Sequence, residues 1–358
     1  MTPKIIFIGY GSATKHKSNG ITNFGINTLK ILKDNNYNVS YFGLSKENKG
    51  SSADHQYVKR VPSCILQFLK IVSCENKNTI YAFNGCMSPY LSLFMMILRF
   101  RKRKYVVFSH GTLNSKALFS LRKLHRLIYL VIIEKYLLKK ASKVFIHTKH
   151  ELPQSIFKKQ NIAVLPAYIP SQTIKLNRER NEQLSFLYLG RDDFYGKGID
   201  RKLKFLRCLA KQTNINKVTF AGIVHSSTKQ KILEELGNTS ITKLSVLGPI
   251  YDEARENLFQ KHNIFMLLSR SEGLPLSLME AMTFGLYPIF SEETNFLDFA
   301  AELGIGSKVD VNRPSEIIHI VEDILKKPKK YHTAGKAGQY FSSDKWIQEF
   351  GKQLALLN

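Results

Sequence analysis

Short apolar runs alternate along this chain with longer segments in which apolar residues recur at helical spacing. The short runs are residues 4–8, 39–42, 79–83, 105–108, 144–147, 163–166, 184–189, 218–222, 244–248 and 264–268. Helical spacing extends over residues 22–34, 90–100, 227–236 and 275–284. Continuous apolar runs are typical of strands buried on both faces, and their alternation with helices indicates parallel sheets. The pattern predicts an α/β protein.

The chain of 358 residues is too long for one ordinary core and suits two domains. Residues 170–183 are polar and show no period, which predicts a linker. We therefore expect one domain over residues 1–166 and a second over residues 184–340. The remaining residues, 341–358, have a helical pattern that places Trp346, the only tryptophan, on the apolar side.

Composition indicates a soluble globular protein, with 44% hydrophobic and 23% charged residues. The cysteines show no Cys-x-x-Cys spacing and predict reduced core thiols, without a metal site; they are Cys64, Cys74, Cys86 and Cys208. The first strand begins at residue 4 without the pattern of an export signal, so we expect a cytoplasmic protein. The best apolar run, residues 127–138, is interrupted by Glu134 and Lys135, so any membrane contact should be peripheral.

The chain has a net charge of +25, and this charge is distributed unevenly along the sequence. Residues 1–165 contain 27 Lys and Arg against 6 Asp and Glu, whereas the remainder contains 26 and 22. Basic runs at residues 99–104 and 158–159, and a helical pattern over residues 116–143 that interleaves cations with apolar residues, favour an anionic lipid surface. A solvated basic face is the simpler alternative for the helical pattern. Nucleic acid is disfavoured, because aromatic residues among the cations are sparse and no helix-turn-helix or zinc pattern occurs.

Two carboxylates eight residues apart mark the most informative stretch, residues 264–291. The strand 264–268 ends in a polar loop that carries Glu272, and Pro275 suits the first turn of the helix that carries Glu280. In open α/β sheets, ligands bind beyond the carboxyl ends of the strands, where this loop lies. Taken alone, Glu280 could equally belong to a solvated stripe of its helix.

Several residues of this stretch agree in order and spacing with a known signature. They are Ser269, Glu272-Gly273, Pro275, Glu280-Ala281-Met282, Gly285 and Pro288. The pattern resembles the Glu-x7-Glu signature of retaining nucleotide-sugar glycosyltransferases of the GT-B class, family 4. The resemblance implies two doubly wound Rossmann-like domains facing across a cleft, with the last helix crossing back to the first domain.

The resemblance also assigns roles around the two carboxylates. It implies that Glu280 binds the ribose hydroxyls of the donor and that Glu272 holds hydroxyls of the transferred sugar. The amides near Gly273 and Leu274 would face the sugar or the phosphate.

Two cations follow the strand 184–189, and the family carries an Arg and a Lys here that clamp the two phosphates of the donor. In this sequence they are Arg191 and Lys197, beside Gly190 and Gly198. Cations at a glycine-bearing loop can neutralise the charge that develops on a leaving diphosphate. No Asp-x-Asp occurs, so we expect no metal and no other cofactor, with Arg191 and Lys197 in the place of a metal ion.

The first half contributes two further residues through the resemblance. Gly20 matches the glycine loop against which the donor diphosphate rests. His110-Gly111 matches a contact with the donor sugar, although a lone histidine is more often structural. Two departures leave the choice of sugar open: Val224 stands where the family has a second glycine, and the loop after Ser291 lacks the usual glycine.

The expected activity is transfer, with retention, of a hexose or N-acetylhexosamine from a nucleotide sugar, with a UDP-sugar favoured. The expected acceptor is lipid-linked or an oligosaccharide, in synthesis of bacterial O-antigen, capsule or lipopolysaccharide at the inner face of the cell membrane. Two alternatives remain. One is a nucleotide-sugar epimerase or hydrolase on the same fold, and the other is a non-enzymatic binder of anionic polymers.

Overall fold

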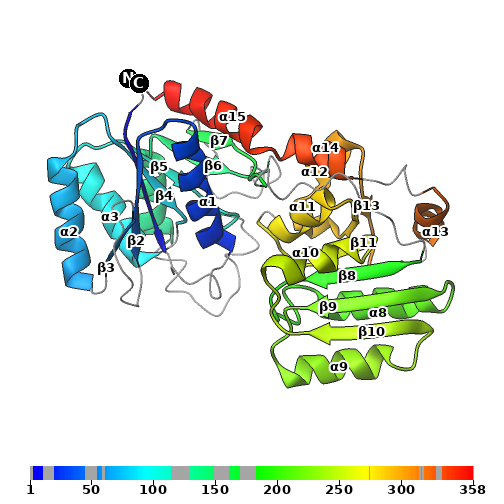
Figure 1. Cartoon of the computed structure of the whole chain (residues 1–358). Helices are drawn as coiled ribbons and strands as arrows, with labels where there is room; N and C mark the ends of the chain where they lie inside the picture. The colour runs from blue at the N-terminus through cyan, green and yellow to red at the C-terminus, as the bar shows by residue number, and fades with distance from the viewer. Residues whose placement is uncertain are drawn as a thin grey trace. The chain divides into compact units, whose positions relative to one another are not determined.

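The protein divides into two compact units, which are described separately (Figure 1). Unit 1 comprises Met1–Ala167 and Trp346–Asn358, and unit 2 comprises Tyr168–Lys345. The computed structural model describes residues 3–10, 20–44, 55–58, 61–86, 88–113, 130–148, 161–169, 183–273, 275–313, 316, 318–327 and 333–357.

A parallel seven-stranded sheet forms the centre of unit 1, in the order β3-β2-β1-β4-β5-β6-β7. Its strands are β1 (Ile5–Tyr10), β2 (Val39–Leu44), β3 (His55–Val58), β4 (Ile80–Asn84), β5 (Tyr105–Phe108), β6 (Lys143–Ile146) and β7 (Ile162–Val164). The order runs outward in both directions from β1 and β4, so a topological switch point lies between these two strands.

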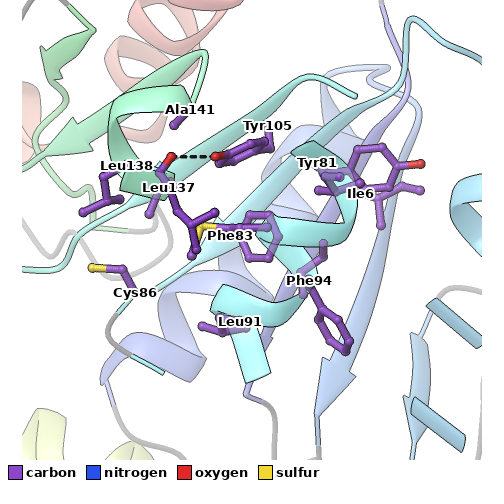
Figure 2. Close-up of a cluster of buried hydrophobic side chains, with 14 of the residues drawn as sticks. Ile6, Tyr81, Phe83, Cys86, Leu91, Phe94, Tyr105, Leu137, Leu138 and Ala141 are labelled. Carbon is purple, nitrogen blue, oxygen red and sulfur yellow. Dashed lines mark hydrogen bonds between the residues drawn. The ribbon is translucent and has the colours of Figure 1, made fainter. Parts of the chain in front are cut away.

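Helices of unit 1 pack on both faces of this sheet. They are α1 (Gly20–Asp34), α2 (Val61–Cys74), α3 (Pro89–Phe100), the short π-helix η2 (Leu130–Glu134), α6 (Lys135–Lys140) and, from Trp346 onward, α15 (Ser343–Ala355). Side chains of α2, α3 and α6 share one buried cluster with β1, β4 and β5. Figure 2 shows part of this cluster, including the hydroxyl of Tyr105, which donates to the carbonyl of Leu137 over 2.5 Å.

The opposite face of the sheet is covered by α1 and the last helix. Trp346 of α15 is buried, as the helical pattern predicted, and its ring lies 6.5 Å from that of Phe108 and 6.1 Å from that of Phe24. Phe350, one turn later, lies 5.8 Å from Phe145 between ring centroids. The last residues of the chain therefore complete the core of unit 1.

Unit 2 also has a central parallel sheet, with six strands in the order β10-β9-β8-β11-β12-β13. They are β8 (Ser185–Leu189), β9 (Ile215–Ala221), β10 (Ile241–Leu247), β11 (Ile264–Leu267), β12 (Tyr287–Phe290) and β13 (Ser307–Lys308). The helices are α8 (Ile199–Ala210), α9 (Ser226–Leu236), α10 (Asp252–Gln260), α11 (Leu276–Thr283), α12 (Leu297–Leu303), α13 (Ile318–Lys326) and α14 (Ala334–Tyr340). The switch point lies between β8 and β11, whose residues Phe186 and Ile264 are paired.

Two sequence-based expectations are wrong in part. The helical pattern over residues 116–143 does not describe one helix, because α6 ends at Lys140 and Lys143 already begins β6; residues 114–129 lie outside the described part. Cys74 is exposed at the end of α2, so it is not a core thiol, while Cys86 is buried and Cys208 is half-buried. None of these three forms a disulfide within the described residues, and the side chain of Cys64 is not among those described.

Candidate functional site

The switch point of unit 2 brings together the two loops that carry most of the predicted site residues. The loop after β8 carries Arg191 and Lys197, and the loop after β11 carries Glu272. Because β8 and β11 are neighbours and run in parallel, both loops leave the same edge of the sheet. Glu280 lies one element further on, in α11.

Two glycines allow these loops to approach neighbouring backbone closely. Gly198 has φ +60°, and a Cβ there would lie 2.0 Å from the carbonyl oxygen of Leu268 at the end of β11. Gly222 has φ +93°, and a Cβ there would lie 2.0 Å from the carbonyl oxygen of Gly190. A side chain at either position would force the loops apart, so glycine permits the site to close.

Lys197 and Glu272 form an ion pair across these two loops. The ammonium nitrogen lies 2.8 Å from each oxygen of the carboxylate. The side chains keep only 17% and 10% of their exposure, so solvent screens the pair less than a surface pair. The structure therefore brings together the residues predicted to meet phosphate and sugar, and it shows them bound to each other.

Asn295 supports Glu272 from the loop after β12. Its side-chain nitrogen donates to the backbone carbonyl of Glu272 over 2.6 Å, and its own backbone has φ +56°. Asparagine tolerates this left-handed conformation better than most residues other than glycine. This loop is the one that lacks the glycine usual in the family.

Arg191 is exposed, and its position depends on backbone contacts. The hydroxyl of Tyr188 donates to the carbonyl of Arg191 over 2.8 Å. Within the ranges that the structure describes, the guanidinium has no hydrogen bond or ion pair. Arg191 therefore offers a cation that no carboxylate of the described residues neutralises.

Asp192, the next residue, binds the start of α9. Its Oδ2 accepts the N–H groups of Val224 and His225 over 2.9 and 2.7 Å, and the ring Nδ1 of His225 lies 2.8 Å away. The side chain of Asp192 is 2% exposed. Val224 and His225, where the sequence departs from the family, therefore hold the loop after β8.

A third lysine lies buried beneath this loop. Lys202 is 0% exposed, and its ammonium donates to the carbonyls of Lys197 and Gly198 and lies 4.5 Å from the ring centroid of Tyr188. Burial lowers the pKa of Lys202 to about 7, against the opposing attraction of Glu272. The charge of this side chain therefore changes near neutral pH.

Arg270 joins the two loops from the outer side. Its guanidinium makes two bonds to the carboxylate of Asp200, of 2.8 and 2.5 Å, and lies 3.6 Å from the ring centroid of Tyr195. Its backbone N–H donates to the carbonyl of Gly196 over 3.0 Å. These contacts fix the loop after β11 against the loop after β8.

Glu280 pairs with Arg255, a residue of α10 that sequence reasoning missed. Burial raises the pKa of the Glu280 carboxyl, and the charge and hydrogen bond of Arg255 oppose this rise. The side chain of Glu280 is 23% exposed, so part of it stays open to solvent. The ion pair shows that its carboxylate has a cationic partner even without a ligand.

Unit 1 places His110 in a group of polar residues at the carboxyl ends of its strands. His110 Nδ1 lies 3.0 Å from Nε2 of His147, and His110 Nε2 lies 2.7 Å from Oδ1 of Asn84. Its ring packs edge-on against Phe24 of α1, with 4.9 Å between centroids. Both ring nitrogens are thus engaged within unit 1, and a sugar contact through Nε2 requires replacing Asn84.

The remaining predicted residues are glycines and a leucine. Gly20 is the first residue of α1. Gly273 lies in the loop after β11, half-buried, whereas Leu274 lies outside the described residues. His110 and Gly20 belong to unit 1, and the other predicted residues belong to unit 2.

Sequence reasoning also missed Asn84 and His147, although their positions beside the predicted His110 gave a usable signal. Asn84, His110 and His147 each stand at or just after the carboxyl end of β4, β5 and β6, which are consecutive in the sheet. Polar residues that follow neighbouring parallel strands meet at one edge, so the group could have been found from the strand assignments. Arg255 and Lys202 gave no such signal, because each occupies an ordinary helical position.

Metal ligands are not gathered in the described part of the chain. There, no three His, Cys, Asp or Glu side chains are placed to hold a metal ion together. In the same part of the chain, every helix is too short or too polar to span a bilayer.

Comparison with protein families locates one match, over residues 171–341, to the family described as Glycosyl transferases group 1. A curated relative is the GDP-mannose:cellobiosyl-diphosphopolyprenol alpha-mannosyltransferase of Xanthomonas oryzae pv. oryzae (strain PXO99A). It is 33% identical over 132 residues, which are 36% of this chain and 33% of the relative. The matched part thus spans about a third of the relative's length.

Solved structures match nearly the whole chain. Sucrose-phosphate synthase from Thermosynechococcus elongatus has a TM-score of 0.75 at 14% identity, with 99% of each chain covered. The lipopolysaccharide outer core galactosyltransferase WaaB has a TM-score of 0.67 at 17% identity, covering 98% of this chain and 99% of its own. At these identities the likeness concerns the fold, which confirms two Rossmann-like units of the GT-B type. Residues 171–341, within unit 2, therefore match the model of the glycosyl transferases group 1 family, and the chain has the fold of GT-B glycosyltransferases.

Proposed function

We propose that this protein transfers a hexose or N-acetylhexosamine from a nucleotide sugar to a lipid-linked or saccharide acceptor, with retention, in bacterial surface polysaccharide synthesis. The observation that carries the proposal is the Lys197–Glu272 pair at the switch point of a domain matched to glycosyltransferases. The pair sets a cation that is able to bind phosphate beside a carboxylate that is able to accept hydrogen bonds from hydroxyl groups.

Both partners of this ion pair keep hydrogen-bonding capacity for a bound nucleotide sugar. An ammonium group has three donors and a carboxylate accepts about four hydrogen bonds, so each partner can take a ligand group while staying near the other. In the proposal, Lys197 and Arg191 bind the diphosphate, and Glu272 accepts sugar hydroxyls. Glu280, held by Arg255, accepts the ribose hydroxyls, and the amides near Gly273 and Leu274 face the sugar or phosphate.

Bond cleavage places negative charge on the departing diphosphate. The charge on the diphosphate is greater in the transition state than in the bound donor. Arg191 and Lys197 therefore stabilise the transition state more than the ground state, which lowers the barrier. In this proposal they take the place of a metal ion. Retention is proposed from the resemblance of the Glu272-to-Glu280 signature.

Contributions from unit 1 are proposed on the same basis. Gly20 would lie against the diphosphate, and His110 would orient the transferred sugar. The substitutions of His147 described below test the proposed role of His110.

The acceptor side is proposed from the charge of unit 1 and from the relative. Arg99, Arg101 and Lys102 are exposed beside Phe100, which is 80% exposed, at the end of α3. Tyr136 of α6 is half-exposed, and α6 packs against α3. Cations around apolar side chains suit an anionic lipid surface. The relative's name specifies a diphosphopolyprenol-linked acceptor, which such a surface would contain.

We favour UDP, and one structural neighbour is described as bound with UDP-2-fluoro glucose, whereas the sequence relative is named for GDP-mannose. Calorimetric titration of the full chain with UDP, GDP, ADP and dTDP tests the donor site. We expect micromolar to millimolar binding of one of them that is weakened by Lys197→Met and Glu280→Gln. Binding that neither substitution weakens would place the nucleotide elsewhere.

A further inference from the structure

A chain of four contacts runs through the polar group at the strand ends of unit 1. The ring Nδ1 of His147 lies 3.0 Å from the carbonyl oxygen of Leu165, and its Nε2 lies 3.0 Å from Nδ1 of His110. The Nε2 of His110 lies 2.7 Å from Oδ1 of Asn84, whose Nδ2 donates to the carbonyl of Ile21 over 2.8 Å. Both ends of the chain are backbone carbonyls, which can only accept.

The direction of each bond follows from the Leu165 end. A carbonyl oxygen accepts, so His147 carries a proton on Nδ1. Burial lowers the pKa of His147 to about 4, so at neutral pH the ring has no second proton and Nε2 is an acceptor. The 3.0 Å contact with His110 is then a hydrogen bond only if His110 donates from Nδ1.

The same reasoning leaves Nε2 of His110 without a proton. Burial, with a smaller effect of His147, holds the pKa of His110 well below its ordinary value, so this ring is also neutral near pH 7. His147 is the titratable group that faces it, while Phe24 from α1 and Asn84 from β4 carry no charge. Two acceptors, Nε2 and Asn84 Oδ1, then face each other.

This chain is one proton short. Three contacts between Leu165 and Asn84 need three protons, and two neutral imidazoles supply two. Exchanging the oxygen and nitrogen of the Asn84 amide would only move the shortage to the Ile21 carbonyl. A hydroxyl group that replaced Asn84 beside Nε2 would bring the missing proton.

We propose that His147 is a positioning residue, which fixes the proton of His110 on Nδ1 and leaves Nε2 as an acceptor for a ligand hydroxyl. His147 is 2% exposed and cannot itself meet a ligand, whereas His110 is partly exposed. That the hydroxyl belongs to a sugar rests on the proposed function. The tautomer itself does not depend on that function.

Ring nitrogens of the full-length protein, labelled with 15N-histidine, report this directly in long-range 1H–15N spectra at pH 7. We expect His110 and His147 both to carry the proton on Nδ1, with their signals assigned by loss in His110→Asn and His147→Gln. A proton on Nε2 of His110 in the parent protein would overturn the inference. This arm needs no donor and no substituted protein to be active.

Two substitutions of His147 separate positioning from packing. His147→Gln places an amide oxygen near the former Nε2 and should keep His110 protonated on Nδ1. His147→Phe keeps the ring volume without an acceptor, so the His110 proton should move to Nε2 and donate to Asn84. If the Phe variant keeps the parental tautomer, His147 does not set it. If the Phe variant fails to fold, the parental spectrum decides.

Kinetics supply the functional arm. Loss of the acceptor should lower kcat/KM for the nucleotide sugar about 10-fold or more in His147→Phe and leave the Gln variant near the parent. Binding of the free nucleoside diphosphate should be equal in all three proteins. Equal kcat/KM in the Phe variant would overturn the positioning role. Absence of transfer by the parent with every donor would overturn the proposed function, while the spectra still decide the tautomer.

Discussion

Lys197 and Glu272 hold each other across the switch point of unit 2, with the lysine nitrogen 2.8 Å from both carboxylate oxygens. The two residues come from loops 75 positions apart in the sequence. Gly198 allows this approach, because any side chain there would collide with the carbonyl of Leu268. The pair is therefore a product of the fold and the natural target of substitution.

Arg191→Ala and Lys197→Met should each lower turnover by roughly 100-fold, because the charge that these cations meet grows as the glycosidic bond breaks. Steady-state kinetics at saturating donor measure this effect. Lys211→Ala, an exposed lysine of the same unit, is the matched control and should retain parental turnover. Chelators should leave the rate unchanged, and strict dependence on an added divalent metal would contradict the proposed roles.

Glu280→Gln should weaken donor binding more than it lowers turnover, because a ribose contact serves the ground state and the transition state equally. Calorimetry and kinetics on one preparation separate the two. Arg255→Met removes the cation that holds the carboxylate and should weaken binding in the same direction. Unchanged donor affinity in Glu280→Gln would refute the ribose assignment.

The buried Lys202 should make the free energy of unfolding depend on pH. Its pKa is lowered on folding to about 7, so the unfolded chain binds more protons between about pH 7 and the ordinary lysine pKa. The free energy of unfolding should therefore rise as pH increases through that window. Below the window Lys202 is charged in both states, and its burial destabilises the folded protein by the full amount.

Lys202→Met removes this term while keeping a long apolar side chain. The difference in unfolding free energy between the Met variant and the parent should fall by a few kcal/mol from pH 7 to pH 10. Urea unfolding at several pH values measures it. Lys204→Met, at an exposed position of the same helix, should show a constant difference. A constant difference for Lys202→Met as well would mean that its pKa is not lowered.

Membrane binding should depend on the exposed cations at the end of α3. Arg103 and Lys104 belong to the same basic run but are structural: Arg103 donates to the carbonyls of Val72 and Glu75, and Lys104 to that of Leu357. The informative variant therefore combines Arg99→Gln, Arg101→Gln and Lys102→Asn, the asparagine suiting the φ of +53° at residue 102.

This triple variant should sediment less with phosphatidylglycerol-containing vesicles than the parent, and the parental binding should fall with salt. The control replaces three exposed lysines of unit 2 by glutamine: Lys211, Lys229 and Lys261. Donor binding should be parental in both variants. Equal sedimentation of the triple variant and the parent would exclude this surface as the lipid contact.

The sequence predicted the strands of the core well, because continuous apolar runs such as residues 105–108 allow only a buried strand in this pattern. It predicted less where the local signal was mixed. The run 116–143 has helical spacing, but Lys143 is the first residue of β6 and pairs with Val106 of β5, so tertiary pairing ended the helix early. The edge strand β3 and the helix α2 were not predicted from the sequence.

The site was predicted as a set of residue types and not as a set of contacts. Spacing alone placed Glu272 and Glu280 on a loop and a helix after one strand, as the structure has them. It could not show that Lys197 binds Glu272, or that Arg255 binds Glu280, because these pairs depend on the order of strands in the sheet. His147 and Asn84 follow β6 and β4, which lie on either side of β5 in the sheet, and this order brings both residues beside His110.

Release of nucleoside diphosphate from a panel of UDP- and GDP-sugars, with and without a polyprenyl-diphosphate-linked saccharide acceptor, tests the central claim most directly. We predict that one donor releases its nucleoside diphosphate only when the acceptor is present, and that Lys197→Met abolishes the release. Equal release without acceptor would identify a hydrolase, and conversion of the donor sugar without release would identify an epimerase. Either result would contradict a glycosyltransferase.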